Sequence, residues 1–387
     1  MTNEEFKLIY FIILSVLIVF TYIESLDLFP SGQTGRQTVL YVLAAGLVCM
    51  LAACRYEVGQ DWSAYSLMFK NCNKPSYWAN YEHGYILLNR LFKSFSDNYY
   101  ILQFFIDVVC GFIIFREFFI KSKSPLFIVF VYYVCQYNFS IDMTMNRMHL
   151  ALAVIVLGHR FIEDRKLLLW IVSVMIAMQF HVTAIAAFPL YWTSKIKISR
   201  KICYGVLLAA FVLTIHGMLF TNKLLSFVQT LTFLPKRFSN IMNSYLVGDL
   251  QGRHQALRTG VGFIVELIIY LFIVLAHDKD DEKSKNIYML NFMIAILIKA
   301  LSTNFDLLKR FANYYMIAGF GILSYNMINE GQYVLAGKIV FDKDSLNKLK
   351  IIALSLFIAF KVLAYILAWK NSYSVDYLPY RVFFLES

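Results

Sequence analysis

The most regular feature of the chain is a succession of long apolar runs separated by short polar links. A helix that crosses the hydrocarbon core of a bilayer needs about 20 mainly apolar residues, and most of these runs approach that length. The twelve runs are Leu8–Ile23, Arg36–Cys54, Asn98–Phe119, Pro125–Phe139, Arg147–Ile162, Leu167–Phe180, Val182–Trp192, Ile202–Phe220, Gly260–Ala276, Ile287–Leu301, Phe311–Ile328 and Ile351–Trp369. The pattern predicts an all-α, polytopic integral membrane protein with about 12 transmembrane helices, which form a single membrane domain over residues 1–387.

Two of the runs are too short to cross a membrane separately. Leu167–Phe180 and Val182–Trp192 are separated only by His181, which suggests two half-helices that meet at this residue. A broken helix at membrane depth is tolerated where it lines a cavity or is buried in protein. We therefore expect a broken or re-entrant pair near residues 167–192.

The Lys and Arg residues predict the orientation of the chain. Basic residues collect in the links that follow the third, fifth, seventh, ninth and eleventh runs. Such links are usually cytoplasmic, and all five can be so only if the 167–192 region crosses the membrane twice. Both termini then lie outside, together with two long links. Residues 55–97 include an amphipathic stretch, Tyr85–Phe95, expected to lie along the surface, and residues 221–259 form a basic loop.

Composition excludes other classes of protein. Of the 387 residues, 59% are hydrophobic and 16% are charged, whereas soluble domains have about 25% charged residues. The net charge of +11 resides mainly in the links between apolar runs, where it sets orientation, so no nucleic-acid partner is expected. The six cysteines show no paired metal-ligand spacing, and we expect neither a disulfide nor a metal site.

Four cationic or titratable residues are predicted to reach the outward side from distant parts of the sequence. They are Arg55, Arg147, His181 and Arg310. Charges inside apolar segments are costly, so each needs a partner or a task. The planar donors of arginine suit bidentate contact with phosphate, which points to an anionic amphiphile such as a lipid-linked diphosphate. Taken singly, Arg147 or Arg310 could instead anchor the end of a helix, and Arg310 could pair with Asp306.

Two residues are candidates for a general base. His181 titrates near neutral pH and suits proton removal from a sugar hydroxyl, or it is a hinge residue bonded to backbone freed by the break. Asp61 could do the same work, or it caps a loop after Gly59. Glu82 opens the amphipathic stretch, where the start of a helix favours an acid in any case.

Three charged residues lie near the middle of predicted helices. Asp107, Glu266 and Lys361 could form an ion-coupling relay of the kind found in transporters. The alternative, which we favour, is a buried structural pair such as Glu266 with Lys361.

Several short motifs occur in an order that resembles a known family. The motifs are Arg55-Tyr56-Glu57-Val58-Gly59-Gln60-Asp61-Trp62-Ser63-Ala64-Tyr65, Glu82-His83-Gly84-Tyr85 with Leu88-Asn89-Arg90-Leu91, Arg147 opening a helix of small residues, Ala177–Ile185, Phe188-Pro189-Leu190-Tyr191, Arg310 with Tyr314 or Tyr315, and Leu378-Pro379-Tyr380. Together they resemble the EpsG-type Wzy proteins, which are bacterial polymerases of O-antigen, capsule and exopolysaccharide. The chain departs from the pattern at Gln60, where the family favours a small hydroxyl residue, and this departure bears on the identity of the substrate.

The resemblance implies a glycosyltransferase that polymerises undecaprenyl-diphosphate-linked oligosaccharide repeat units on the extracytoplasmic face of a bacterial inner membrane. The lipid-linked oligosaccharide would be both donor and acceptor, membrane lipid would surround the protein, and a chain-length regulator is a further candidate partner. Arginines would stabilise the departing diphosphate, so neither a metal nor a cofactor is required. The expected site comprises Arg147, Arg310 and Arg55 for the diphosphate, His181 or Asp61 as base, and Tyr65, Glu82, Asn146 and Tyr314 for other substrate contacts.

Two other functions remain open from the sequence. A flippase or transporter for the lipid-linked oligosaccharide would use the mid-helix charges, although the related halves common in transporters are not visible. A membrane glycan O-acyltransferase would also use a histidine, but it leaves the arginines without a role.

Overall fold

The protein is described from a computed structural model and is mostly helical. The structure describes residues 3–25, 35–122, 124–135, 137–196, 198–229, 263, 266–267, 286–301, 309–317, 334–335, 339–340, 343–369 and 376–385. The chain divides into two compact units, one formed by residues 1–191 with 320–387 and the other by residues 192–319. The first unit contains most of the predicted site.

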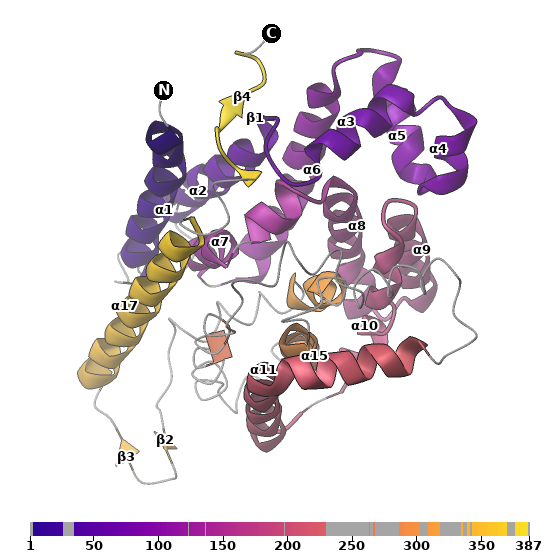
Figure 1. Ribbon diagram of the computed structural model, residues 1–387. Coiled ribbons are helices and arrows are strands. Elements are labelled where there is room, and N and C mark those ends of the chain that lie inside the picture. Colours follow the sequence, from indigo (N-terminus) through magenta and orange to yellow (C-terminus); the bar gives the residue numbers. More distant parts are fainter. Residues whose placement is uncertain are drawn as a thin grey trace. The chain divides into compact units, whose positions relative to one another are not determined.

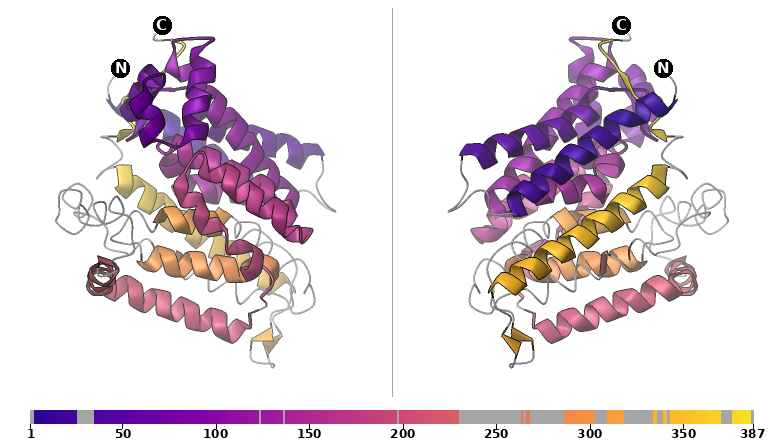
Figure 2. Two further views of the ribbon diagram at one scale, coloured as in Figure 1. Left: turned by 90° about the vertical axis from the view of Figure 1, so that its right-hand side faces the viewer. Right: turned by 90° about the vertical axis from the view of Figure 1, so that its left-hand side faces the viewer.

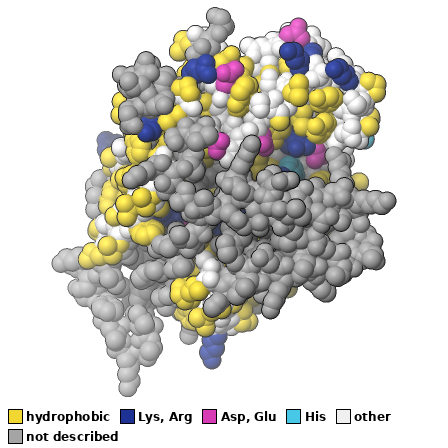
Figure 3. Space-filling view, viewed as in Figure 1, with side chains coloured by type: hydrophobic (Ala, Val, Ile, Leu, Met, Phe, Trp, Pro, Cys, Tyr) yellow, Lys and Arg dark blue, Asp and Glu magenta, His cyan; other side chains and the backbone are white. Residues whose placement is uncertain are grey.

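Long helices form the body of the first unit (Figures 1 and 2). They are α1 (Asn3–Ser25), α2 (Gly35–Ala53), α6 (Tyr99–Lys121), α7 (Pro125–Val134), α8 (Asn146–Glu163), α9 (Leu167–Met178) and α17 (Lys343–Ala368). Their inner faces bury side chains such as Tyr10 and Leu17. Their outer faces are also apolar, with Leu8 on α1 58% exposed and Leu356 on α17 67% exposed. Figure 3 shows the resulting hydrophobic surface along α1 and α17. Exposed apolar side chains of this kind are what lipid requires.

Two of the described helices are long and apolar enough to cross a membrane by length and composition, Lys7–Ser25 and Gly35–Ala53. Shorter apolar helices accompany them at Pro125–Val134, Leu167–Met178, Val182–Thr193, Lys201–Ile215, Met289–Leu301 and Leu354–Ala368. Five helices coincide with predicted runs, and most of their ends agree with the prediction to within a few residues: α1, α2, α6, α8 and α17. These helices are consistent with an all-α membrane protein.

A buried carboxylate ties three helices together at the end of the unit that carries the basic links. Glu24, near the end of α1, accepts hydrogen bonds from the backbone N–H of Leu126 at 3.0 Å and of Phe127 at 2.9 Å. It also accepts one from Gln37 Nε2 of α2 at 3.0 Å. The first N–H groups of a helix have no partner within the helix, and an anion there is favourable.

The region after α8 turns back on itself, as the distribution of basic links requires. The α-helix α9 ends at Met178, and after His181 the chain continues as a 3₁₀ helix, η2 (Val182–Ala187), and a short helix, α10 (Leu190–Thr193). Tyr191 Oη donates to the carbonyl of Arg165 at 2.9 Å, so the chain returns to the end where α9 begins. The second half is not a regular α-helix, because Pro189 cannot donate a backbone hydrogen bond.

The fourth run differs from its prediction as one helix, Pro125–Phe139. The helix α7 ends at Val134, and a separate π-helical turn, η1 (Asn138–Asp142), follows. Asn138 Nδ2 donates to Asp142 Oδ2 at 3.0 Å and to the carbonyl of Val48 at 3.3 Å. These buried side-chain bonds stabilise the turn in place of another turn of α-helix, and π-turns often accompany functional sites.

The link at 55–97 contains three helices, of which the sequence predicted one. They are α3 (Trp62–Asn71), α4 (Pro75–Asn80) and α5 (His83–Lys93). The helix α5 corresponds to the predicted amphipathic stretch: Tyr85 and Ile86 are buried, whereas Leu87 and Leu91 are 54% and 53% exposed.

The C-terminal tail closes over the start of this link. The strand β1 (Arg55–Tyr56) pairs antiparallel with β4 (Arg381–Val382), with Arg55 opposite Val382. The backbone N–H of Gly59 donates to the carbonyl of Asp376 at 2.8 Å. Gly59 has a φ of +102°, and a Cβ there would lie 2.0 Å from the carbonyl oxygen of Met143, so only glycine fits. A second pair of short strands, β2 (Val334–Leu335) and β3 (Ile339–Val340), lies elsewhere in the unit.

The described part of the second unit is also helical. It contains α11 (Arg200–Gln229), α15 (Asn286–Leu301) and a helical segment at 309–317. The helix α11 extends into the predicted basic loop at 221–259, and the rest of that loop lies outside the described residues. Most of the ninth run, Gly260–Ala276, also lies outside them.

We predict that Gly84→Ala weakens the packing of α5 against the end of α9. A Cβ at Gly84 would lie 2.8 Å from both Cβ and the carbonyl oxygen of Gln179, and overpacking of this kind costs about 1–3 kcal/mol. The purified protein should unfold at a lower temperature. Gly46→Ala is the control, because nothing lies within 4 Å of its added Cβ. Equal melting temperatures for the two variants would contradict the close approach.

Candidate functional site

Three elements that are distant in sequence meet at Glu82, directly before α5. Glu82 Oε2 pairs with Arg147 Nη1, in the first turn of α8, at 2.6 Å. Glu82 Oε1 accepts from the backbone N–H of Val182, the first residue of η2, at 3.4 Å. Three residues after Glu82, the backbone N–H of Tyr85 donates to the carbonyl of Gln179 at 3.2 Å. Glu82 therefore joins the 55–97 link, α8 and the break at His181.

Aromatic rings surround the Arg147 guanidinium. Its Cζ lies 5.8 Å from the ring centroid of Tyr65 on α3 and 5.8 Å from that of Tyr81, within the range of a cation–π interaction. The side chain of Arg147 is 22% exposed and that of Glu82 is 17% exposed. We call Tyr65, Tyr81, Glu82, Arg147 and Val182 the Arg147 site. It is a partly buried ion pair that an incoming ligand can reach.

Two donors at this site have no hydrogen bond within the described part of the chain. They are Arg147 Nε and Tyr85 Oη, both buried. The Tyr85 ring meets that of Tyr65 edge-on at 5.7 Å. Burial raises the pKa of the Tyr85 phenol well above its usual range, so the hydroxyl keeps its proton at neutral pH. Buried donors are usually paired, and an anion that approached Arg147 would provide acceptors.

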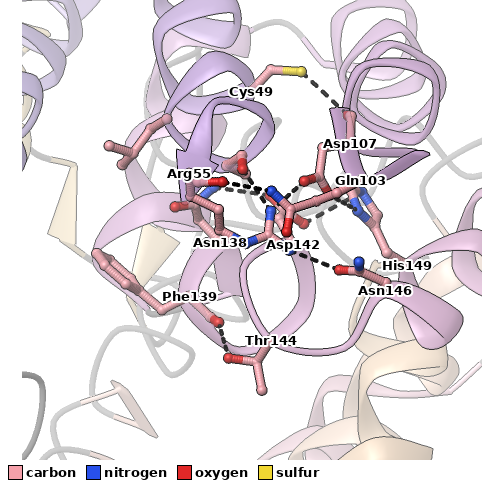
Figure 4. Close-up of polar contacts among 12 residues, drawn as sticks. Cys49, Arg55, Gln103, Asp107, Asn138, Phe139, Asp142, Thr144, Asn146 and His149 are labelled. Carbon is pink, nitrogen blue, oxygen red and sulfur yellow. Dashed lines mark hydrogen bonds and ion pairs between the residues drawn. The ribbon is translucent and has the colours of Figure 1, made fainter. Parts of the chain in front are cut away.

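A network of buried charged and polar groups lies on the other side of α8 (Figure 4). Arg55 forms an ion pair with Asp107 of α6, and its Nη2 donates to Asn146 Oδ1 at 2.8 Å. His149 lies between two carboxylates, with Nδ1 3.3 Å from Asp107 Oδ1 and Nε2 3.4 Å from Asp142 Oδ1. We call Arg55, Asp107, Asp142, Asn146 and His149 the buried polar core. Each of them is at most 2% exposed.

The buried polar core changes the interpretation of two predicted site residues. Arg55 is 1% exposed and Asn146 is 0% exposed, so in this structure neither presents its side chain to the surface. Arg55 was expected to contact a diphosphate, and Asn146 to contact substrate. Instead, Arg55 fixes Asn146, which precedes Arg147 directly at the start of α8. A charge this deeply buried requires a counter-charge, and Asp107 provides it.

The break at His181 has a clear structural cause. The Nδ1 atom of His181 accepts from the backbone N–H of Thr183 at 3.2 Å and lies 2.7 Å from Thr183 Oγ1. This side chain, 6% exposed, thereby caps the 3₁₀ helix that follows. The geometry is that of the hinge interpretation of His181. Asp61 occupies the position before α3, and its carbonyl accepts from the N–H of Tyr65 at 3.1 Å.

The remaining predicted residues lie in other parts of the chain. Arg310 and Tyr314 belong to the second unit, so the first unit builds the Arg147 site without them. Arg310 is partly exposed and Tyr314 is buried. Glu266, also in the second unit, pairs with Lys299 at 2.5 Å, and Lys361 lies in α17 of the first. Among the described residues, no group of three or more His, Cys, Asp or Glu side chains is arranged to hold a metal ion.

Asp142 and His149 were missed as members of the polar core. The available signal was the spacing of Asn146 and His149, which share one face of α8. Their partners on α6 and η1 are separated from them in the sequence, and spacing alone does not reveal such partners.

We predict that two neighbouring tyrosines respond differently to loss of their hydroxyl. Tyr99 Oη accepts from Asn146 Nδ2 at 2.9 Å, so Tyr99→Phe leaves a buried donor unpaired and costs about 1–3 kcal/mol. Tyr85→Phe removes a hydroxyl that has no hydrogen-bond partner within the described residues, and stability should change by less than about 1 kcal/mol. Thermal unfolding of the two variants tests this expectation. A larger loss for Tyr85→Phe would contradict the geometry.

Comparison with known proteins agrees with the motifs. No curated protein and no solved structure matches the chain. The model of the EpsG family matches residues 38–382, which include most of α2, the helices α3 to α9, the whole Arg147 site, the second unit and the strand β4. Because this match covers most of the sequence, the chain belongs to the EpsG family.

Proposed function

We propose that this protein polymerises oligosaccharide repeat units that are carried on undecaprenyl diphosphate. Membership of the EpsG family suggests a polysaccharide polymerase, and the apolar helices agree with a lipid-linked substrate. We further propose that the chain crosses a bacterial inner membrane about 12 times and that the Arg147 site faces the outside. In support, Lys121 at the end of α6 pairs with Glu163 at the end of α8 at 2.8 Å, so two of the basic links lie together, away from Arg147.

The reaction sets the requirement for the site. A hydroxyl of the incoming repeat unit attacks the anomeric carbon of the growing chain, and the lipid diphosphate departs with the bonding electrons. Diphosphate is already a good leaving group, so the main need is fixed positive charge where negative charge develops.

Arg147 carries this proposal. It is a partly exposed guanidinium fixed between two aromatic rings, with a buried Nε that has no acceptor within the described residues. Planar donors of this type suit a phosphate oxygen pair. Arg310 is proposed as the second cationic contact, with Tyr65 and Tyr314 as further contacts to the substrate. Arg55 is reassigned from contact with diphosphate to support of α8.

His181 is assigned to the hinge rather than to proton removal. Its Nδ1 already accepts from Thr183, and its side chain is buried. Asp61 occupies the N-cap position before α3, where its carbonyl accepts from the N–H of Tyr65. Glu82 pairs directly with Arg147 at 2.6 Å.

The competing functions lose their specific motivation. A transporter was suggested by unpaired charges at mid-membrane, but Asp107 pairs with Arg55 and Glu266 with Lys299. An O-acyltransferase was suggested by a membrane-embedded histidine, and His181 caps η2.

We predict that Arg147→Ala abolishes long polysaccharide chains while the protein remains folded in membranes. Removal of one donor that stabilises developing charge costs about 10²–10³ in rate. Sizing of the glycans from cells that carry the variant should show single repeat units. Arg160→Ala is the matched control, because Arg160 lies exposed in the last turn of the same helix. Normal chain lengths with Arg147→Ala would overturn the proposed function of this residue.

A second prediction separates the two roles of His181. In His181→Asn, the side-chain oxygen can accept from the Thr183 N–H as Nδ1 does, but it cannot act as a base at neutral pH. Chain length should therefore be preserved within about threefold, whereas His181→Ala loses the cap, which costs about 0.5–2 kcal/mol. If His181→Asn is inactive but as stable as the unmodified protein, the hinge assignment is wrong.

A further inference from the structure

We infer that Glu82 is the proton acceptor of this site, and that Arg147 holds it in reserve until the donor's diphosphate displaces it. The inference rests on the proposed function, since it names the group that activates the acceptor hydroxyl. Glu82 would thus have two successive partners: Arg147 in the resting protein and a sugar hydroxyl in the reacting complex.

The first support is the position of the carboxylate. Glu82 Oε2 lies 2.6 Å from Arg147 Nη1, so an anion that binds this guanidinium must come within contact distance of Glu82. The N–H of Val182 holds the other oxygen, Oε1, at 3.4 Å. The carboxylate is therefore held between a side-chain partner and a backbone partner. When Arg147 turns to a ligand, Oε2 is the oxygen that is released.

The second support is the spare donor capacity of Arg147. A guanidinium has five N–H donors, and one of its nitrogens, Nε, is buried without a hydrogen bond in the described part of the chain. The contacts of Arg147 with Glu82 and Tyr65 thus leave its Nε without an acceptor in the described part of the chain. A diphosphate has more acceptor oxygens and more negative charge than Glu82, so exchange of one anion for the other improves the pairing of Arg147.

The third support is the arrangement of the surroundings. Tyr65 and Tyr81 flank the guanidinium, and their rings keep Arg147 close to its place when Glu82 leaves it. The side chain of Glu82 is 17% exposed, so a sugar hydroxyl can approach it. The alternative base, His181, has its Nδ1 engaged with Thr183 and is 6% exposed.

One bond forms and one bond breaks at the anomeric carbon, and one proton is transferred. The hydroxyl oxygen of the incoming repeat forms a bond to the anomeric carbon of the growing chain. The bond from that carbon to the diphosphate oxygen breaks, and its electron pair leaves on the diphosphate, where Arg147 stabilises the charge. The hydroxyl proton passes to Glu82 Oε2. When the lipid diphosphate leaves, the proton passes from Glu82 to water and the pair with Arg147 forms again.

This sequence imposes an order on the two substrates. The base becomes available only after the donor diphosphate has taken Arg147, so an acceptor that binds alone meets a carboxylate turned toward Arg147. Such an order keeps the carboxylate of Glu82 paired with Arg147 whenever no donor is bound.

The test uses Glu82→Gln in the full-length protein, with inorganic pyrophosphate as the binding probe. The amide keeps the shape but removes the negative charge that competes for Arg147, so pyrophosphate should bind about tenfold more tightly than to the unmodified protein. Polymerisation should fall by about 10²–10⁴, the usual contribution of a general base. Glu57→Gln is the matched control, because Glu57 pairs with Arg381 at 2.9 Å and is 34% exposed. It should change neither quantity.

Glu82→Asp guards against a variant that simply misfolds. It keeps a carboxylate, so its polymerisation should exceed that of Glu82→Gln by at least about tenfold. The inference is overturned if Glu82→Gln polymerises normally, if it binds pyrophosphate more weakly than the unmodified protein, or if Glu82→Asp is no more active than Glu82→Gln. Failure of the proposed function looks different: the unmodified protein would then make no chains from lipid-diphosphate-linked repeats, whatever the binding results.

Discussion

The first unit depends on the ion pair between Arg55 and Asp107, which is buried among apolar helices. It connects the end of α2 to the middle of α6, and through Asn146 and His149 it extends to α8 and η1. Arg55 balances the charge of Asp107, and His149 lies within 3.4 Å of a carboxylate oxygen of both Asp107 and Asp142. Removing one partner of such a group leaves an uncompensated charge and costs about 3–5 kcal/mol. The start of α8, and so the position of Arg147, is fixed by this balance rather than by apolar packing alone.

Arg55 and Arg147 differ in how deeply their side chains are buried, and this difference separates their proposed roles. Arg55 contacts the first turn of α8 through Asn146, whereas Arg147 belongs to that turn. Arg55 is buried and pairs with Asp107, whereas Arg147 is partly exposed and pairs with Glu82, directly before α5. A charge with a permanent partner stabilises structure, and one with an exchangeable partner is available for a ligand.

Much of the fold was predictable because lipid imposes a simple pattern. Apolar length located α1, α2, α6, α8 and α17, and the distribution of basic links required the return at His181. The π-turn after α7 and the helices α3 and α4 were not predicted, because buried hydrogen bonds and local packing determine them rather than periodicity. Within the site, the sequence suggested the same role for Arg147 and for Arg55. The two arginines are distinguished by their ion-pair partners in the folded structure: Asp107 pairs with Arg55, and Glu82 pairs with Arg147.

The pairing of β1 with β4 has a consequence for biogenesis. The residues that clasp Tyr56 and Gly59 are near the far end of the sequence. During translation the ribosome delivers the early helices first, at about 5–20 residues per second. The 55–97 link, which carries Glu82, therefore lacks its pairing with β4 until nearly the whole polypeptide has been synthesised. The end of the protein that carries the Arg147 site is thus completed last, after the helices that it joins have been synthesised.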